Sequence, residues 1–193
     1  IMMSMHKKQR YNVRYSKRKG VKVNRGYTID HFNTFYKLYS ETGIRQKYYY
    51  RSENYLRKMW EIFNREGLVH ILTAYYKKEP LASWMLFSYD NVLYYPYGGS
   101  SESHRNLQAS CLVGWEAILL GKELGCDTFD MWGATEDMSN KDDPYYGFSL
   151  FKEKFGARHV NYINSYDFVI NPSMYKLFIS ANNVRWKVLK ALR

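Results

Sequence analysis

Three consecutive segments, residues 69–76, 81–89 and 92–98, carry the mixture of β-branched, aromatic and apolar residues that is typical of strands. Short turn signals separate them, "KKEP" after the first segment and Asp90-Asn91 after the second. Connections this short join antiparallel neighbours, because parallel strands need a long crossover. The sequence therefore predicts a three-stranded antiparallel meander, around which the rest of the chain must pack.

Apolar residues at helical spacing surround this meander, and glycines mark several helix ends. Before it, we expect a basic helix over 5–18 ending at Gly20, a strand from Val21, and helices over 28–42 and 52–66. After it, we expect a long helix over 107–125, a short buried strand over 128–133, a polar loop over 134–146, a short helix over 147–156, a strand or hairpin pair over 159–170 and a basic amphipathic helix over 173–193.

This element order is that of the acetyltransferase-like (GNAT) fold, an α/β (α+β) architecture with a mixed central sheet flanked by helices. With 193 residues the chain has the length of one domain, so we treat 1–193 as a single GNAT-like lobe. Because it begins at Ile1, within a charged segment, we interpret it as part of a longer protein.

The formal net charge of +11 is concentrated near the two ends, in "HKKQRYNVRYSKRKGVK" and "RWKVLKALR". Such an excess favours polyanionic partners: RNA, nucleotide-linked substrates or an anionic membrane face. A solvated basic face that only confers solubility is the alternative. No apolar run is long enough for a transmembrane helix and no secretory signal is evident, which predicts a cytoplasmic protein with, at most, peripheral membrane contact.

The two cysteines, Cys111 and Cys126, lack the spacing of a metal site, and no histidines lie at metal-ligand intervals. They are expected to be reduced core thiols, and no metal site is predicted.

Five stretches, in this order and spacing, resemble the C-terminal portion of the Fem (FemABX) family. They are "RYNVRYSKRKGVKV" at 10–23, "TGIRQKYYYRSENYLRKMW" at 42–60, "YYPYGGSSESHRNLQASCLVGWEAI" at 94–118, "GCDTFDMWGA" at 125–134 and "YYGFSLFKEKFGARHVNYINSYDFVINP" at 145–172. The resemblance implies an aminoacyltransferase that moves an amino acid from an aminoacyl-tRNA to the peptide of a peptidoglycan precursor. It implies two GNAT-like lobes, of which this chain would be one, and no metal or redox cofactor.

The resemblance places Phe151 and Lys152 at the transfer site. Ester aminolysis passes through an oxyanion, which a fixed ammonium stabilises, and the aromatic ring can pack against the tRNA terminus. Read without the resemblance, Phe148, Phe151 and Phe155 form an apolar stripe at helical spacing with Lys152 facing solvent.

For the nucleotide diphosphate of the precursor, the resemblance favours Arg51 with Tyr55 one helical turn later, and Arg45 nearby. An arginine fork can engage two phosphate oxygens. The alternative is surface charge, with Tyr55 in the core.

The segment His104-Arg105-Asn106 opens a predicted helix and could hold an anion there. No glycine follows Arg105 to let the backbone approach a coenzyme A pyrophosphate, which argues against that cofactor. Alternatively, Asn106 caps the helix and Arg105 pairs with Glu102.

Asp130, in an apolar strand, is expected to orient a neighbouring loop rather than to act as a base. Two further functions stay open: an acyl-coenzyme A-dependent N-acyltransferase, and a non-catalytic lobe that binds tRNA or a nucleotide-linked sugar.

Overall fold

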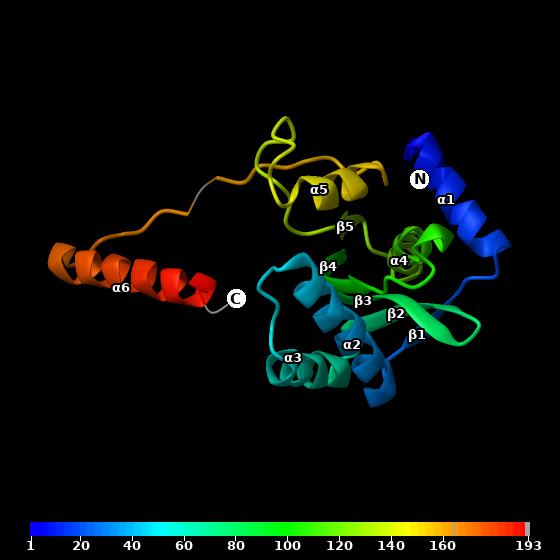
Figure 1. Cartoon of the computed structure of the whole chain (residues 1–193), viewed down its shortest axis with the longest axis horizontal. Helices are drawn as coiled ribbons and strands as arrows, with labels where there is room; N and C mark the ends of the chain where they lie inside the picture. Colours follow the sequence, from blue (N-terminus) through cyan, green and yellow to red (C-terminus); the bar gives the residue numbers. More distant parts are fainter. Residues whose placement is uncertain (164, 192–193) are drawn as a thin grey trace. The chain divides into compact units, whose positions relative to one another are not determined.

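The predicted meander forms the centre of a five-stranded mixed sheet. In the computed structural model, which describes residues 1–163 and 165–191, the strand order is β1-β2-β3-β4-β5 (Figure 1). The strands are β1 (Lys22–Gly26), β2 (Val69–Tyr76), β3 (Glu79–Tyr89), β4 (Val92–Ser100) and β5 (Thr128–Asp130). The first four are antiparallel, and β5 runs parallel to β4.

Both turns of the meander contain two consecutive residues with positive φ, Lys77-Lys78 and Asp90-Asn91. Two positive φ values are the signature of the hairpin turn whose twist matches that of the strands. The antiparallel prediction is therefore confirmed, together with its turn positions.

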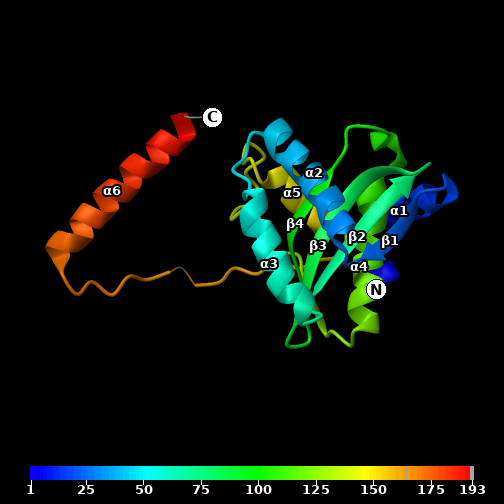
Figure 2. The same cartoon turned by 90° about the horizontal axis from the view of Figure 1, so that it is seen from below.

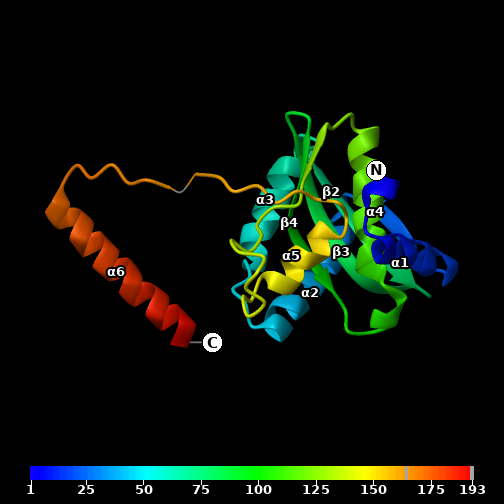
Figure 3. The same ribbon diagram turned by 90° about the horizontal axis from the view of Figure 1, so that it is seen from above.

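Helices cover both faces of the sheet (Figure 2). The helices α2 (Ile29–Gln46) and α3 (Glu53–Arg65) pack on one face through an aromatic cluster that includes Phe32, Phe35 and Trp60. The other face carries α1 (Lys7–Arg18), α4 (Ala109–Glu123) and α5 (Tyr146–Glu153). In Figure 3, α5 lies over the β3 and β4 part of the sheet, beside α4. This arrangement is the predicted mixed sheet flanked by helices.

Two 3₁₀ turns, η1 (Met2–Ser4) and η2 (Arg105–Leu107), precede α1 and α4. Cys111 is buried and Cys126 is half-buried, and neither forms a disulfide.

The strand β5 is shorter than the sequence predicted. It pairs over three residues with Val92–Tyr94, and β4 continues beyond that pairing to Ser100. The remainder of the predicted strand, Met131 to Gly133, forms the start of a loop instead. The parallel strands therefore part at Tyr94 and Asp130, and the candidate site lies there.

The chain divides into two units, Ile1–His159 and Val160–Arg193. The first contains the sheet and α1 to α5. The second contains α6 (Pro172–Ala191), whose N-terminus is capped by Asn171 Oδ1, the acceptor for Ser173 N at 3.0 Å and Met174 N at 3.1 Å. No helix within the described residues has the length and apolar character needed to cross a bilayer.

The predicted strand or hairpin pair over 159–170 is wrong: none of the described residues in this segment belongs to a strand. Its alternating apolar residues are exposed, with Tyr162 at 82% and Phe168 at 93%. Strand-like alternation cannot form a strand alone, because the backbone donors and acceptors of a strand need a neighbouring strand.

Candidate functional site

The site is centred on Lys152, which α5 directs toward the point where β4 and β5 part. Its side chain is buried, only 4% of the residue being exposed. Nζ donates a hydrogen bond of 2.6 Å to the carbonyl oxygen of Gly133, in the loop after β5. The ammonium also lies 3.8 Å from the ring centre of Phe148 and 5.9 Å from that of Tyr95.

Burial lowers the pKa of Lys152 from 10.5 to about 7, and the nearby Asp130 carboxylate acts in the opposite direction. An ammonium has three donors. Among the described residues, the Gly133 carbonyl is the hydrogen-bond acceptor of Nζ, and the ring of Phe148 lies against the ammonium. Lys152 is therefore not the solvent-facing lysine of the alternative interpretation, and it forms no salt bridge with another described residue.

The loop after β5 is held by two side chains. Asp130 Oδ1 accepts a hydrogen bond of 2.6 Å from the backbone N–H of Trp132, so the prediction that Asp130 orients a loop is confirmed. On α5, Ser149 Oγ accepts from the N–H of Thr135 at 2.7 Å. Since Ser149 and Lys152 lie one turn apart on α5, both form hydrogen bonds with the backbone of the same loop.

Phe151 points to a different side of α5. Its ring lies edge-on to Trp84, at 6.2 Å, and to Phe155, at 5.2 Å. Trp84 in turn stacks on Tyr95 with ring centres 3.7 Å apart. A continuous aromatic layer therefore connects the Phe151 side of α5 to the Lys152 side.

Tyr95 is the site residue that the sequence reasoning missed. It is fully buried, and burial raises the pKa of its hydroxyl, so the group stays neutral. Strand alternation in "VLYYPYG" could not have found it, because residues two apart in a regular strand share a face. Tyr95 packs on the α4 face and Tyr97 on the α2 and α3 face, since the register between β3 and β4 shifts at Met85–Phe87, opposite this part of β4.

A cavity of about 260 Å³ lies between α1, the start of α4 and α5. Phe151 lines it, and two cations, Lys8 and Lys154, do so as well. The other lining residues are neutral: Gln9, Asn12, Gln108, Cys111 and Gly147. The cavity is polar and basic, with no carboxylate in its lining.

Arg51 and Tyr55 lie together, as their spacing predicted. The guanidinium carbon of Arg51 is 5.3 Å from the ring centre of Tyr55, at the start of α3. Tyr55 is 49% exposed, so it is not the core residue of the alternative interpretation. The backbone N–H of Arg51 donates to Tyr39 Oη at 3.1 Å, which fixes the segment that leads into α3.

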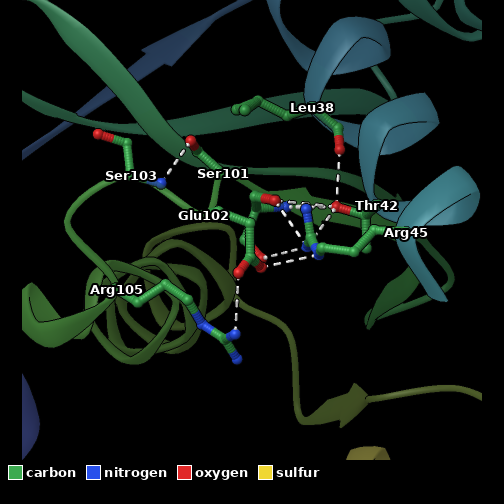
Figure 4. A network of polar contacts seen from close by, with 8 residues as sticks. Leu38, Thr42, Arg45, Ser101, Glu102, Ser103 and Arg105 are labelled. Carbon is green, nitrogen blue, oxygen red and sulfur yellow. Dashed lines mark hydrogen bonds and ion pairs between the residues drawn. The ribbon is translucent and has the colours of Figure 1, made fainter.

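Arg45 has structural partners at the end of β4 and in the loop after it. Nη2 donates to the carbonyl oxygen of Ser100 at 2.9 Å, and Nε forms an ion pair of 2.8 Å with Glu102 (Figure 4). Thr42 Oγ1 bonds the same segment, donating to the Ser100 carbonyl at 3.1 Å. Arg45 therefore ties the last turn of α2 to the end of β4.

Arg105 forms the predicted ion pair with Glu102, at 3.1 Å, so Glu102 bridges Arg105 and Arg45 (Figure 4). His104 Nε2 lies 3.6 Å from a carboxylate oxygen of Glu79, and its ring is edge-on to Tyr76. These partners come from the protein itself.

The predicted cap at Asn106 is wrong, because this residue lies within η2 and α4 begins only at Ala109. The N–H groups of Leu107, Gln108 and Cys111 all donate to carbonyl oxygens inside the same loop. These three backbone donors are therefore not free to hold a pyrophosphate.

The FemAB family model matches residues 1–76 and 69–183 of this chain. Curated relatives include the lipid II:glycine glycyltransferases of Staphylococcus epidermidis, 32% identical over 110 residues, and of Staphylococcus aureus, 29% identical over 121 residues. These alignments cover 55% and 61% of this chain but 26% and 28% of the relatives. The chain thus spans about a quarter of the length of the curated relatives it matches.

Two solved structures show the fold. The crystal structure of FemX superposes with a TM-score of 0.74 at 17% identity, covering 81% of this chain and 55% of FemX. An aminoglycoside 6'-N-acetyltransferase from Acinetobacter haemolyticus gives a TM-score of 0.55 at 14% identity, covering 78% of this chain and 99% of that enzyme. The prediction of a GNAT-like fold is therefore confirmed.

Proposed function

This chain belongs to the FemAB family, and from that premise we propose that it carries the transfer site of an aminoacyltransferase. The enzyme moves an amino acid from an aminoacyl-tRNA to the peptide of a peptidoglycan precursor, on the cytoplasmic side of the membrane. The names of the staphylococcal relatives, lipid II:glycine glycyltransferases, support a precursor of this kind as acceptor. No metal or redox cofactor takes part in the proposed reaction.

The observation that carries the proposal is the buried Lys152 side chain, whose Nζ is held by the Gly133 carbonyl at 2.6 Å. In the reaction, the acceptor amine attacks the ester carbonyl and a C–N bond forms. The C–O bond to the tRNA ribose then breaks, and the proton that the amine loses ends on the leaving ribose hydroxyl. The carbonyl oxygen bears negative charge in the tetrahedral intermediate. A fixed cation in a site of low dielectric stabilises that charge far more than a solvated one does.

The acceptor binds, in this proposal, at the exposed Arg51 and Tyr55. An arginine fork held over a tyrosine ring suits the two phosphates that link the precursor to its nucleotide or lipid. Arg45, Arg105 and His104 instead maintain the loop between β4 and α4, because their partners are Ser100, Glu102 and Glu79.

The basic cavity beside Phe151 offers a place for the phosphates near the tRNA 3' end. Its two lysines supply charge, and its carboxamide side chains supply both donors and acceptors.

The proposal is tested by incubating the protein with tRNA that carries a radiolabelled amino acid and with a lipid-linked or nucleotide-linked precursor. We expect label in the precursor, and we expect Lys152→Ala to lower kcat by about 100-fold or more, the effect of losing one oxyanion donor. Lys141→Ala, in the exposed loop before α5, serves as control. An unchanged kcat in a folded Lys152→Ala variant would show that Lys152 takes no part in the chemistry. Acetyl transfer from acetyl-coenzyme A, with no aminoacyl transfer, would instead identify the protein as an acyl-coenzyme A-dependent N-acyltransferase.

The acceptor site is tested separately. Arg51→Ala should raise KM for the precursor at least tenfold with little change in kcat, since Arg51 is assigned to binding alone. The matched control is Arg57→Ala in the adjoining helix α3, because Arg57 is already paired with Glu53 and Asn33. Equal KM values for the two variants would show that Arg51 is an ordinary surface charge with no role in binding the precursor.

A further inference from the structure

The carbonyl that holds Lys152 belongs to a turn with unusual backbone geometry. Trp132, the residue before Gly133, has a φ of 65°, in the left-handed region that a bulky side chain rarely adopts. Placing a non-glycine residue there costs on the order of 1 kcal/mol, so surrounding contacts must hold it.

Two contacts hold Trp132. Asp130 Oδ1 accepts its backbone N–H at 2.6 Å, which closes a side-chain turn over residues 130–132. Its indole lies edge-on to Tyr94, at 6.1 Å, on the neighbouring strand β4. The next carbonyl along the chain, that of Gly133, accepts a hydrogen bond from Lys152 Nζ at 2.6 Å.

The same Asp130 carboxylate acts on Lys152 through its charge. It favours the ammonium form, against the burial that disfavours it. From β4, the titratable group facing the ammonium is Tyr95, which burial keeps neutral. Asp130 thus supplies negative charge close to a cation that has little solvent around it.

We propose that Asp130 is a positioning residue for the transfer reaction: its hydrogen bond to the Trp132 N–H sets the turn that presents the Gly133 carbonyl to Lys152, and its carboxylate acts on that lysine through its charge. Asp130 itself does not touch the substrate. The kinetic part of this inference rests on the proposed function, whereas the turn and the charge effect can be measured without substrates.

Three variants separate the two roles. Asp130→Asn keeps the oxygen that accepts the Trp132 N–H but removes the charge. Asp130→Ala removes both. Asp130→Ala combined with Trp132→Gly removes both but places a glycine, which adopts positive φ without help, at the strained position.

The first measurement is the pKa of Lys152, followed by NMR in protein with isotope-labelled lysine side chains, the signal being assigned from its absence in Lys152→Met. We expect a lower pKa in Asp130→Asn than in the wild type. An unchanged pKa would overturn the charge role, and this result does not depend on any activity of the protein.

The second measurement is the pH profile of aminoacyl transfer. Asp130→Asn should retain the acid-side rate and move the alkaline decline to lower pH, because the ammonium is lost sooner. Asp130→Ala should lower kcat at least tenfold at every pH, with the glycine double variant recovering part of the loss. Identical profiles for Asp130→Asn and Asp130→Ala, or no recovery by the double variant, would overturn the turn-holding role. Absence of transfer in the wild type would instead contradict the proposed function and leave the NMR result standing.

Discussion

Phe151 and Lys152 are adjacent in sequence, but their side chains contact different parts of the protein. Successive residues of an α-helix point about 100° apart, because the helix turns once in 3.6 residues. Lys152 therefore reaches the Gly133 carbonyl and the face of Tyr95, while Phe151 packs against Trp84 and lines the basic cavity. One helix thus contributes to both the proposed charge-stabilising group and the proposed tRNA cavity.

The burial of Lys152 predicts a stability effect that depends on pH. A pKa lowered from 10.5 to about 7 corresponds to a folding penalty on the order of 5 kcal/mol, at about 1.4 kcal/mol per pH unit. Below pH 7 the lysine is charged in both states and the folded state bears the whole penalty. Between pH 7 and 10.5 the unfolded state binds more protons, so the stability of the wild type rises with pH.

Lys152→Met should therefore raise the melting temperature most below pH 7, with the gain shrinking toward pH 10.5. Thermal unfolding of both proteins across this pH range measures it. The exposed Lys58→Met on α3 is the matched control and should show no such pH-dependent gain. A Lys152→Met protein that is less stable than the wild type at pH 6 would contradict the burial argument.

At the scale of elements, the contact between α2 and β4 places the loop between β4 and α4. Gly99 on β4 lies directly against the backbone of α2, where any Cβ would overlap the Leu38 carbonyl. This close approach lets Thr42 and Arg45, one and two turns later on α2, bond the backbone of Ser100. The loop that contains Glu102 and Arg105 then starts from a fixed point (Figure 4).

Gly99→Ala should consequently destabilise the protein by about 3 kcal/mol, the upper end for overpacking, since a backbone group cannot move aside as a side chain can. Denaturant unfolding measures this. Gly147→Ala on α5 is the control: no atom lies within 4 Å of its added Cβ, and we expect a gain of about 0.5 to 1 kcal/mol from helix propensity. Equal effects of the two substitutions would show that α2 does not pack tightly on β4.

At the scale of the whole molecule, the net charge of +11 predicts salt-dependent binding of nucleic acid. Some of the basic side chains that contribute to this charge line two cavities. The cavity beside Phe151 combines Lys8 from α1 with Lys154 from the end of α5. A second basic cavity, of about 450 Å³, lies where β1 begins and β2 ends, and its lining includes Lys22, Lys77 and Lys78.

Lys8→Glu combined with Lys154→Glu should weaken binding of an RNA hairpin that carries the tRNA acceptor end. We expect the slope of log K against log salt to fall in magnitude by about 2, about one for each lost phosphate contact. Fluorescence anisotropy over a salt series measures both quantities. The control is Lys22→Glu with Lys78→Glu at the second cavity: if it weakens binding as much, net charge rather than the first cavity governs association.

Local patterns were sufficient for most of the fold. The meander, its two turns and the helix ends at Gly20 and Gly125 were all predictable, because each depends on residues within a few positions of one another. The Arg105–Glu102 pair, three residues apart, was predictable for the same reason. The strand over 159–170 was not, because a strand depends on a partner elsewhere in the chain.

The chemistry of the site divides in the same way. The sequence by itself determined the residue types: a lysine beside a phenylalanine on a short helix, an arginine before a tyrosine, and an aspartate within a short apolar strand. Only the tertiary structure decided that Lys152 is buried, that its partner is a carbonyl nineteen residues earlier, that Tyr95 lies beneath it, and that Arg45 is bound to the protein itself. The reason is that burial and long-range hydrogen bonds arise when α5 packs over the parting strands, and no local pattern encodes the distance between them.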